Sequence, residues 1–327
     1  RQRQMCIRDR GKGINLVFLG DGFDAENISN GDYLRVMNEQ MERFFDIEPY
    51  HTYRDYFNVS TAIAVSPESG IGTVNTIRNT KFETTFTGEV GLRGNYSTIF
   101  NYAMEVSPVD ESNLNQSLII VTPNTIDYGG ITEMWTDGSA IAFCPLSEDS
   151  YPYDARGIIQ HEAGGHGFGK LGDEYIYHNT FIDFCDCTCC EHVFEFNIAK
   201  SLGWYENLSL TGKMHEVPWS HLIFDDRYSD VVDIYEGGFM HARGVFRSEQ
   251  NSCMNNNISY YNAISREAIV KRIMEYAGES YSFEKFVEND KRDAVNSLSR
   301  SAERPGVTVR GNQYAPRIHK GKPDILK

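Results

Sequence analysis

The sequence predicts an α/β domain in which a mainly parallel, twisted β-sheet is covered by helices and is followed by an irregular, loop-rich half. Apolar runs of strand length alternate with segments of helical periodicity through the first half of the chain. This alternation favours parallel strands, because a helix between two strands carries the chain back to the start of the sheet. With 327 residues, of which 40% are hydrophobic, the chain is long enough to bury a large core.

The strands are predicted from apolar, β-branched and aromatic runs. Residues 14–23, INLVFLGDGF, form an apolar run that ends in a Gly-Asp-Gly turn. A helix over residues 32–45 should follow, because apolar side chains recur there at steps of three and four. Residues 56–65 and 117–124 are expected to be the second and third strands. Residues 139–146 are expected to form a short strand along an edge of the sheet.

Three later segments are predicted to be helical. Residues 154–169, DARGIIQHEAGGHGFG, are expected to form a central helix, and residues 193–205 carry helical periodicity. A further helix over residues 265–278 should begin at Ser265 as its N-cap and stop at Gly278, since these residue types favour the two ends of a helix.

Charge and composition limit the possible domain organisation of the chain and the partners that it could bind. Residues 1–10 resemble translated adapter sequence and are expected to be a non-native leader, residues 11–295 one domain, and residues 296–327 a basic, Pro-containing C-terminal arm. The net charge is −15 and the basic residues are scattered, so nucleic acid is not an expected partner. No apolar run approaches the roughly 20 residues of a membrane span. The sequence leaves the oligomeric state open.

The cysteines bear on the compartment of the protein. Four of the seven fall within CDCTCC: Cys185, Cys187, Cys189 and Cys190. This density favours disulfides in an oxidising compartment over a thiolate metal site, because no second CxxC pair is present. Free thiols remain an alternative.

The stretch QHEAGGHGFGKLGDEY, residues 160–175, contains two histidines five positions apart. Residues of an α-helix advance by about 100° each, so His161 and His166 would diverge by about 140° and could not bind one metal. A π-bulge would return both to one face. Gly164 and Gly165 lie between them and have no side chains to clash there, although each destabilises a helix by about 1 kcal/mol. We therefore expect a locally widened helix whose two imidazoles bind a single ion.

Carboxylates around the two histidines complete a candidate catalytic site. Glu162 directly follows the first histidine, as in zinc peptidases, where this carboxylate accepts the proton of the attacking water. Catalytic zinc usually has three protein ligands. Glycines after His166 should turn the chain back, so Asp173 is expected to be the third ligand, with Glu174 as the alternative. The other acid is expected to hydrogen-bond a ligand histidine. The remaining histidines of this part of the chain have no competing spacing and are expected to be surface or core residues: His178, His192, His215, His221 and His241.

HEAGGHGFGKLGDEY resembles the signature HExGHxFGxLxDEY of the IgA-peptidase family of metzincin-like zinc metallopeptidases, with one additional residue before His166. A similar HExxGH motif occurs in the dipeptidyl peptidase III family. INLVFLGDGF is similar to the start of the family's catalytic domain, and residues 227–247 and NSCMNNN, residues 251–257, are similar to the segment before its Met-turn and to the Met-turn itself.

The resemblance covers about residues 13–278 and implies a metzincin-like zinc peptidase domain that binds Zn²⁺. Carried over to this chain, it implies that the metal ligands are His161, His166 and Asp173. It further implies that Glu162 is the general base and acid and that Met254 packs beneath the metal without binding it.

The expected function is hydrolysis of peptide bonds in an extracellular or periplasmic protein or peptide, by an endopeptidase. The substrate is expected to lie extended and to pair with the strand near residues 140–143. Tyr260 and Tyr261 are candidates for stabilising the oxyanion, but core or rim aromatics are the simpler interpretation. Two alternatives stay open: an exopeptidase, and a non-catalytic ligand- or glycan-binding protein on the same fold. A lipid anchor on a missing leader also stays open.

Overall fold

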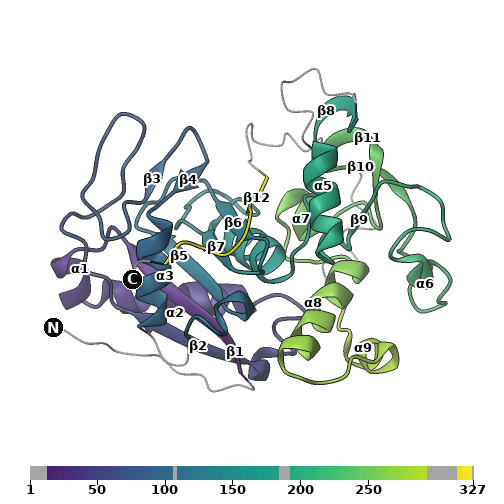
Figure 1. Ribbon diagram of the computed structural model, residues 1–327, viewed down its shortest axis with the longest axis horizontal. Helices are drawn as coiled ribbons and strands as arrows, with labels where there is room; N and C mark the ends of the chain where they lie inside the picture. The colour runs from purple at the N-terminus through teal and green to yellow at the C-terminus, as the bar shows by residue number, and fades with distance from the viewer. Residues whose placement is uncertain (1–12, 106–108, 184–191, 293–314, 326–327) are drawn as a thin grey trace.

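The computed structural model describes residues 13–105, 109–183, 192–292 and 315–325. Its larger sheet has six strands in the order β12-β6-β7-β5-β1-β2 (Figure 1). These strands are β1 (Ile14–Asp21), β2 (Phe57–Ala62), β5 (Leu118–Pro123), β6 (Ile131–Trp135), β7 (Ala140–Phe143) and β12 (Arg317–His319). Only the β6–β7 pair is antiparallel within this sheet. The predicted α/β class with a mainly parallel sheet is therefore confirmed.

Helices cover both faces of this sheet, which explains why its central strands are buried along their whole length. All residues of β1 are buried, and its alternate side chains enter two different cores. Leu16 and Phe18 pack with α2 (Asp32–Phe45), whereas Val17 packs with α3 (Tyr96–Met104). The predicted helix over residues 32–45 is confirmed with the same bounds.

The prediction that residues 139–146 form an edge strand is wrong, because the strand there, β7, lies inside the sheet. It is hydrogen-bonded to β5 on one side and to β6 on the other, so it has no free edge for a substrate to pair with. The strand β6 was not predicted, because a polar residue, Glu133, interrupts its apolar pattern. This carboxylate is fully buried and is paired by Arg317 at 3.0 Å and His319 at 2.7 Å. Both partners belong to β12, so part of the expected C-terminal arm is a strand of the sheet.

The second half of the chain is more regular than predicted. A smaller sheet contains β8 (Ile176–Phe181), β9 (Leu208–Ser209), β10 (Tyr235–Gly238) and β11 (Met240–Arg247). Five helices accompany it: α5 (His192–Ser201), α6 (Ser220–Ile223), α7 (Cys253–Asn256), α8 (Ala263–Tyr276) and α9 (Phe283–Asn289). In Figure 1 this half lies beside the large sheet. Glycines at positive φ interrupt two of these strands, Gly237 in β10 and Gly244 in β11, and β9 has only two residues. Such strands lack the regular pattern that predicts a strand from sequence.

Smaller elements complete the described residues. They are α1 (Ala25–Ser29), η1 (Arg54–Tyr56), η2 (Leu114–Gln116) and the hairpin of β3 (Thr85–Phe86) and β4 (Leu92–Arg93). Among these residues, no helix combines the length and the apolar character that a membrane crossing requires.

One predicted helix cap needs correction, and two predicted segments lie outside the described ranges. The N-cap of α8 is Asn262, not Ser265, because the Asn262 side chain accepts a hydrogen bond from Ser265 N at 3.0 Å. Gly278 follows the helix at φ 68°, as a glycine stop should. The cysteines of CDCTCC and residues 1–10 lie outside the described residues, whereas Cys144 and Cys253 are buried free thiols.

Candidate metal centre and active site

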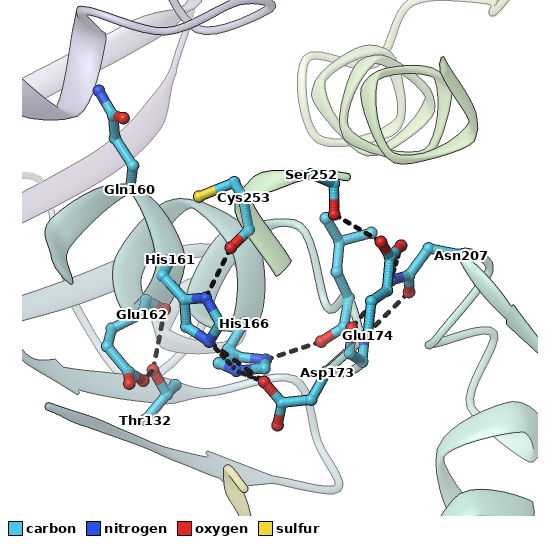
Figure 2. Close-up of polar contacts among 12 residues, drawn as sticks. Thr132, Gln160, His161, Glu162, His166, Asp173, Glu174, Asn207, Ser252 and Cys253 are labelled. Atoms are coloured by element: carbon cyan, nitrogen blue, oxygen red, sulfur yellow. Dashed lines mark hydrogen bonds and ion pairs between the residues drawn. The ribbon is translucent and has the colours of Figure 1, made fainter. Parts of the chain in front are cut away.

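The central helix widens where the two histidines lie. The helix α4 (Ala155–Ile159) begins at Asp154, whose carboxylate accepts from Gly157 N, and passes directly into a π-helix, η3 (Gln160–Phe168). Hydrogen bonds of a π-helix join residues five apart, so such residues lie on one face. His161 and His166 consequently point the same way (Figure 2). The predicted widening is confirmed and extends over nine residues.

The two glycines of this turn allow the segment around α7 to approach closely. A Cβ on Gly165 would lie 2.2 Å from Met254 Sδ, and one on Gly164 would lie 2.4 Å from Tyr261 Oη. Both distances are far shorter than van der Waals contact, so neither position accepts a side chain without movement of its neighbour. Met254 is fully buried, and its sulfur lies against the turn that carries the histidines.

Three side chains from the helix and the following loop converge at one point. His161 Nε2 and His166 Nε2 lie 3.1 Å apart, and each lies 3.1 Å from Asp173 Oδ1. Ligand atoms of a tetrahedral zinc site with bonds of 2.0–2.1 Å are separated by about 3.3 Å. Among the described residues, a metal ion would need at least three His, Cys, Asp or Glu side chains close together, and these three side chains meet that condition.

The hydrogen bonds on the far side of each imidazole fix its tautomer. His161 Nδ1 lies 2.9 Å from Cys253 O, and His166 Nδ1 lies 2.8 Å from Leu171 O. Because a carbonyl oxygen only accepts, each Nδ1 carries hydrogen, and when the ring is neutral its Nε2 lone pair points into the cluster. The second oxygen of Asp173 is also buried without a hydrogen-bond partner among the described residues. Two such lone pairs and a carboxylate require a cation between them, and this donor set fits Zn²⁺.

Protons and a metal ion compete for this cluster. Burial lowers the pKa of His161, but the hydrogen bond and charge of Asp173 outweigh it and raise the pKa to about 9. Burial raises the pKa of Asp173, but the charge of His166 and the hydrogen bonds from both histidines hold it well below the usual range. The electrostatic field of the cluster therefore favours positive charge between the three side chains.

Asp173 and Glu174 point to opposite sides of the chain that leads into β8 (Figure 2). Asp173 faces the histidines, whereas Glu174 accepts hydrogen bonds from three side chains elsewhere: Asn207 at 2.9 Å, Asn262 at 2.7 Å and Ser252 at 2.5 Å. Of the two acids left open by the sequence, only Asp173 belongs to the cluster. The expectation that the other acid would hydrogen-bond a ligand histidine is wrong, because Glu174 instead anchors the loop to the segment around α7.

Glu162 extends from the π-helix beside the cluster. Its Oε2 atom lies 2.9 Å from Thr132 Oγ1 on β6, which also lies 2.8 Å from the backbone oxygen of Glu162. Burial raises the pKa of this carboxyl group, and the charges of His166 and His161 oppose the rise. Glu162 and His161 line one narrow cleft together with Tyr175 and Gly130. A carboxylate placed in this way can take up a proton and return it.

The two tyrosines after Met254 lie away from this cleft. Tyr260 donates a hydrogen bond to Glu249 Oε2 at 2.7 Å, and Tyr261 donates to the backbone oxygen of Gln160. Both side chains are buried behind the helix, so the simpler interpretation as core aromatics is confirmed. Tyr175 was not predicted to be a site residue, although its two-residue spacing from Asp173 would put both side chains on one side of an extended segment.

The buried pair of Tyr260 and Glu249 makes stability depend on pH. Burial raises the pKa of Glu249 from 4.5 to about 7. Between these values the folded protein binds more protons than the unfolded chain, so stability falls as pH rises, by about 3 kcal/mol in total. Glu249→Gln should therefore match the parent near about pH 5 and be more stable near about pH 8 in urea unfolding. Equal stability of the two proteins at both pH values would show that this carboxyl group does not titrate as described.

A second contact between histidines was not foreseen. His192 Nδ1 lies 2.8 Å from His241 Nε2, and Thr180 Oγ1 lies 3.1 Å from His241 Nδ1. Burial and the neighbouring histidines lower the pKa of His241 to about 4. These residues come from β8, α5 and β11, so no sequence spacing could have linked them.

An α/β domain that presents two histidines and two carboxylates around one buried helix has the architecture of a peptidase domain. The family model described as IgA peptidase M64 matches residues 7–200, which is more than half of the chain. The chain belongs to the IgA peptidase M64 family and is a peptidase by descent. No curated protein matches the sequence. The matched residues end before residues 227–257, whose likeness to the Met-turn region therefore stays a prediction.

Proposed function

We propose that the protein is a zinc-dependent peptidase that hydrolyses peptide bonds of an extracellular or periplasmic protein or peptide. The observation that carries this proposal is the convergence of His161 Nε2, His166 Nε2 and Asp173 Oδ1, with Glu162 beside them in the cleft. A structural metal site would not need a carboxylate of this kind. This comparison favours the enzyme over a ligand- or glycan-binding protein.

In the proposed mechanism, His161, His166 and Asp173 hold the zinc ion and Glu162 moves the proton. When held there, zinc would supply Lewis acidity to the scissile carbonyl and to the attacking water. Glu162 accepts a proton from the attacking water as its oxygen bonds to the carbonyl carbon, and then gives the proton to the departing amine nitrogen. Thr132 orients the Glu162 carboxylate, and the carbonyls of Leu171 and Cys253 orient the two imidazoles.

The walls of the cleft are suited to a peptide backbone. Two glycines, Gly129 and Gly130, line it, and a Cβ on Gly130 would lie 3.0 Å from Glu162 Cγ. A side chain at this position would therefore crowd the proposed base, whereas glycine leaves room for the substrate. Cleavage within a chain, as by an endopeptidase, is the mode that we propose, and the metzincin-like placement of Met254 is part of the same proposal.

Removal of the metal provides the direct test. We expect a chelator to abolish cleavage of casein or a peptide library, and one equivalent of Zn²⁺ per chain to restore it. Metal analysis of the purified protein should find zinc in the active fraction. Cleavage that persists in the metal-free protein would rule out the proposed mechanism, and zinc binding without cleavage would favour the binding protein.

A further inference from the structure

A tyrosine side chain, Tyr175, lies beside Glu162, and the proposed proton transfer does not use it. Tyr175 lines the same cleft as His161 and Glu162. The side chain is 1% exposed, and its hydroxyl group is buried without a hydrogen-bond partner among the described residues. A buried hydroxyl without a partner is destabilising by about 1–3 kcal/mol, so its presence beside the reacting groups needs an explanation.

The neighbours of Tyr175 fix its ring. It lies two residues after Asp173 and directly before β8, and its backbone oxygen accepts from Met240 N at 3.0 Å. Its ring is nearly parallel to that of His161, at 21° with centroids 6.3 Å apart, and the ring of Tyr177 lies 4.9 Å away on another side. The phenol is thus held beside a proposed metal ligand before any substrate binds.

We propose that Tyr175 is a further catalytic residue, whose hydroxyl group donates a hydrogen bond to the scissile carbonyl oxygen as negative charge develops there. This inference rests on the proposed peptidase function. When water bonds to the carbonyl carbon, the π electrons move to the carbonyl oxygen and the proton of the water goes to Glu162. When the C–N bond breaks, these electrons re-form the carbonyl and the proton goes to the amine. Tyr175 keeps its own proton throughout and contributes only the hydrogen bond.

Another side-chain donor on the cleft wall has a different explanation. Asn257 also lines the cleft, but it follows α7 at φ 57°, where asparagine is favoured for its backbone conformation. The backbone conformation therefore accounts for asparagine at this position without a role in the reaction.

A positioning role through Asp173 is the competing explanation for Tyr175. Burial, followed by the charge of Asp173, raises the pKa of Tyr175 well above its usual value, and a side-chain hydrogen-bond interaction with Asp173 adds to the rise. The two groups are therefore close, although the hydroxyl group has no partner at ordinary hydrogen-bond distance among the described residues. If the phenol served only to hold Asp173, its loss would weaken zinc binding. If it binds the oxyanion, its loss would weaken binding of a transition-state analogue and leave zinc affinity unchanged.

The test compares Tyr175→Phe with the matched control Tyr177→Phe, both measured in the zinc-loaded full chain. We expect Tyr175→Phe to lower kcat by about 10²–10³-fold with little change in KM, because one oxyanion donor is lost. Its affinity for a phosphinic peptide, which mimics the tetrahedral oxyanion, should fall by a similar factor, whereas zinc affinity of the metal-free protein should not change. Tyr177→Phe should resemble the parent in all three measurements.

Three results would overturn the inference: unchanged kcat in Tyr175→Phe, zinc affinity that falls as far as activity does, or an equal loss in Tyr177→Phe. The parent and Glu162→Gln separate these results from failure of the proposed function. If the parent cleaves peptides and Glu162→Gln does not, the peptidase stands and only the role of Tyr175 has failed. If the zinc-loaded parent cleaves nothing, the peptidase itself has failed, and the inference about Tyr175 fails with it.

Discussion

Glu162→Gln is expected to lower kcat by about 10²–10⁴-fold, the range for loss of a general base and acid. Glutamine has nearly the same shape and can still accept the hydrogen bond of Thr132, which lies 2.9 Å from Oε2 in the parent. It cannot accept a proton from water at neutral pH. We therefore expect zinc content and thermal stability to stay close to those of the parent while cleavage of a peptide library is lost.

The matched control for this variant is Glu174→Gln. Glu174 is a second fully buried carboxyl group of the same region, and burial raises its pKa as it does that of Glu162. Glutamine at this position can accept from Asn207 and Asn262 through its oxygen and donate to Ser252 through its nitrogen. The control should keep most of the activity. An active Glu162→Gln protein would disprove the proposed role of Glu162, whatever the control does.

Asp173→Asn is expected to weaken zinc binding by at least about 100-fold, because even outer-shell partners of metal ligands contribute up to this factor. The substitution removes the negative charge that both imidazoles face at 3.1 Å, while the shape of the side chain stays the same. The variant should therefore bind too little zinc for cleavage, as measured by competition with a chromophoric chelator.

Thermal unfolding offers a second measurement of the same loss. Zinc at 100 times its dissociation constant stabilises a protein by about 2.7 kcal/mol, so the parent should gain in Tm on addition of zinc and Asp173→Asn should not. Glu174→Gln should gain as the parent does. If Asp173→Asn retained the zinc affinity of the parent and Glu174→Gln lost it, the assignment of the third ligand would have to be exchanged.

Much of the first half of the fold could be predicted from local patterns. The strand β1 and the helix α2 each bury a continuous run or a regular stripe, and such patterns are complete within the segment itself. The position of β7 could not be obtained in this way. Its place in the interior depends on β6, whose buried Glu133 is acceptable only because Arg317 and His319 pair with it from a distant part of the chain.

The same division holds for the candidate site. The widened helix was predicted from two glycines between His161 and His166, because the period of helical hydrogen bonds is a local property. The selection of Asp173 over Glu174 and the recognition of Tyr175 were not local, since Glu174 turns toward Asn207, Ser252 and Asn262.

The sequence by itself determined the class of fold, the family, and the two histidines that share one face of a widened helix. The tertiary structure decided which acid faces these histidines, how Met254 lies against their helix, and that Tyr175 lines the cleft. The physical reason is that a side chain in a loop follows its hydrogen-bond partners, and here those partners lie tens of residues away along the chain.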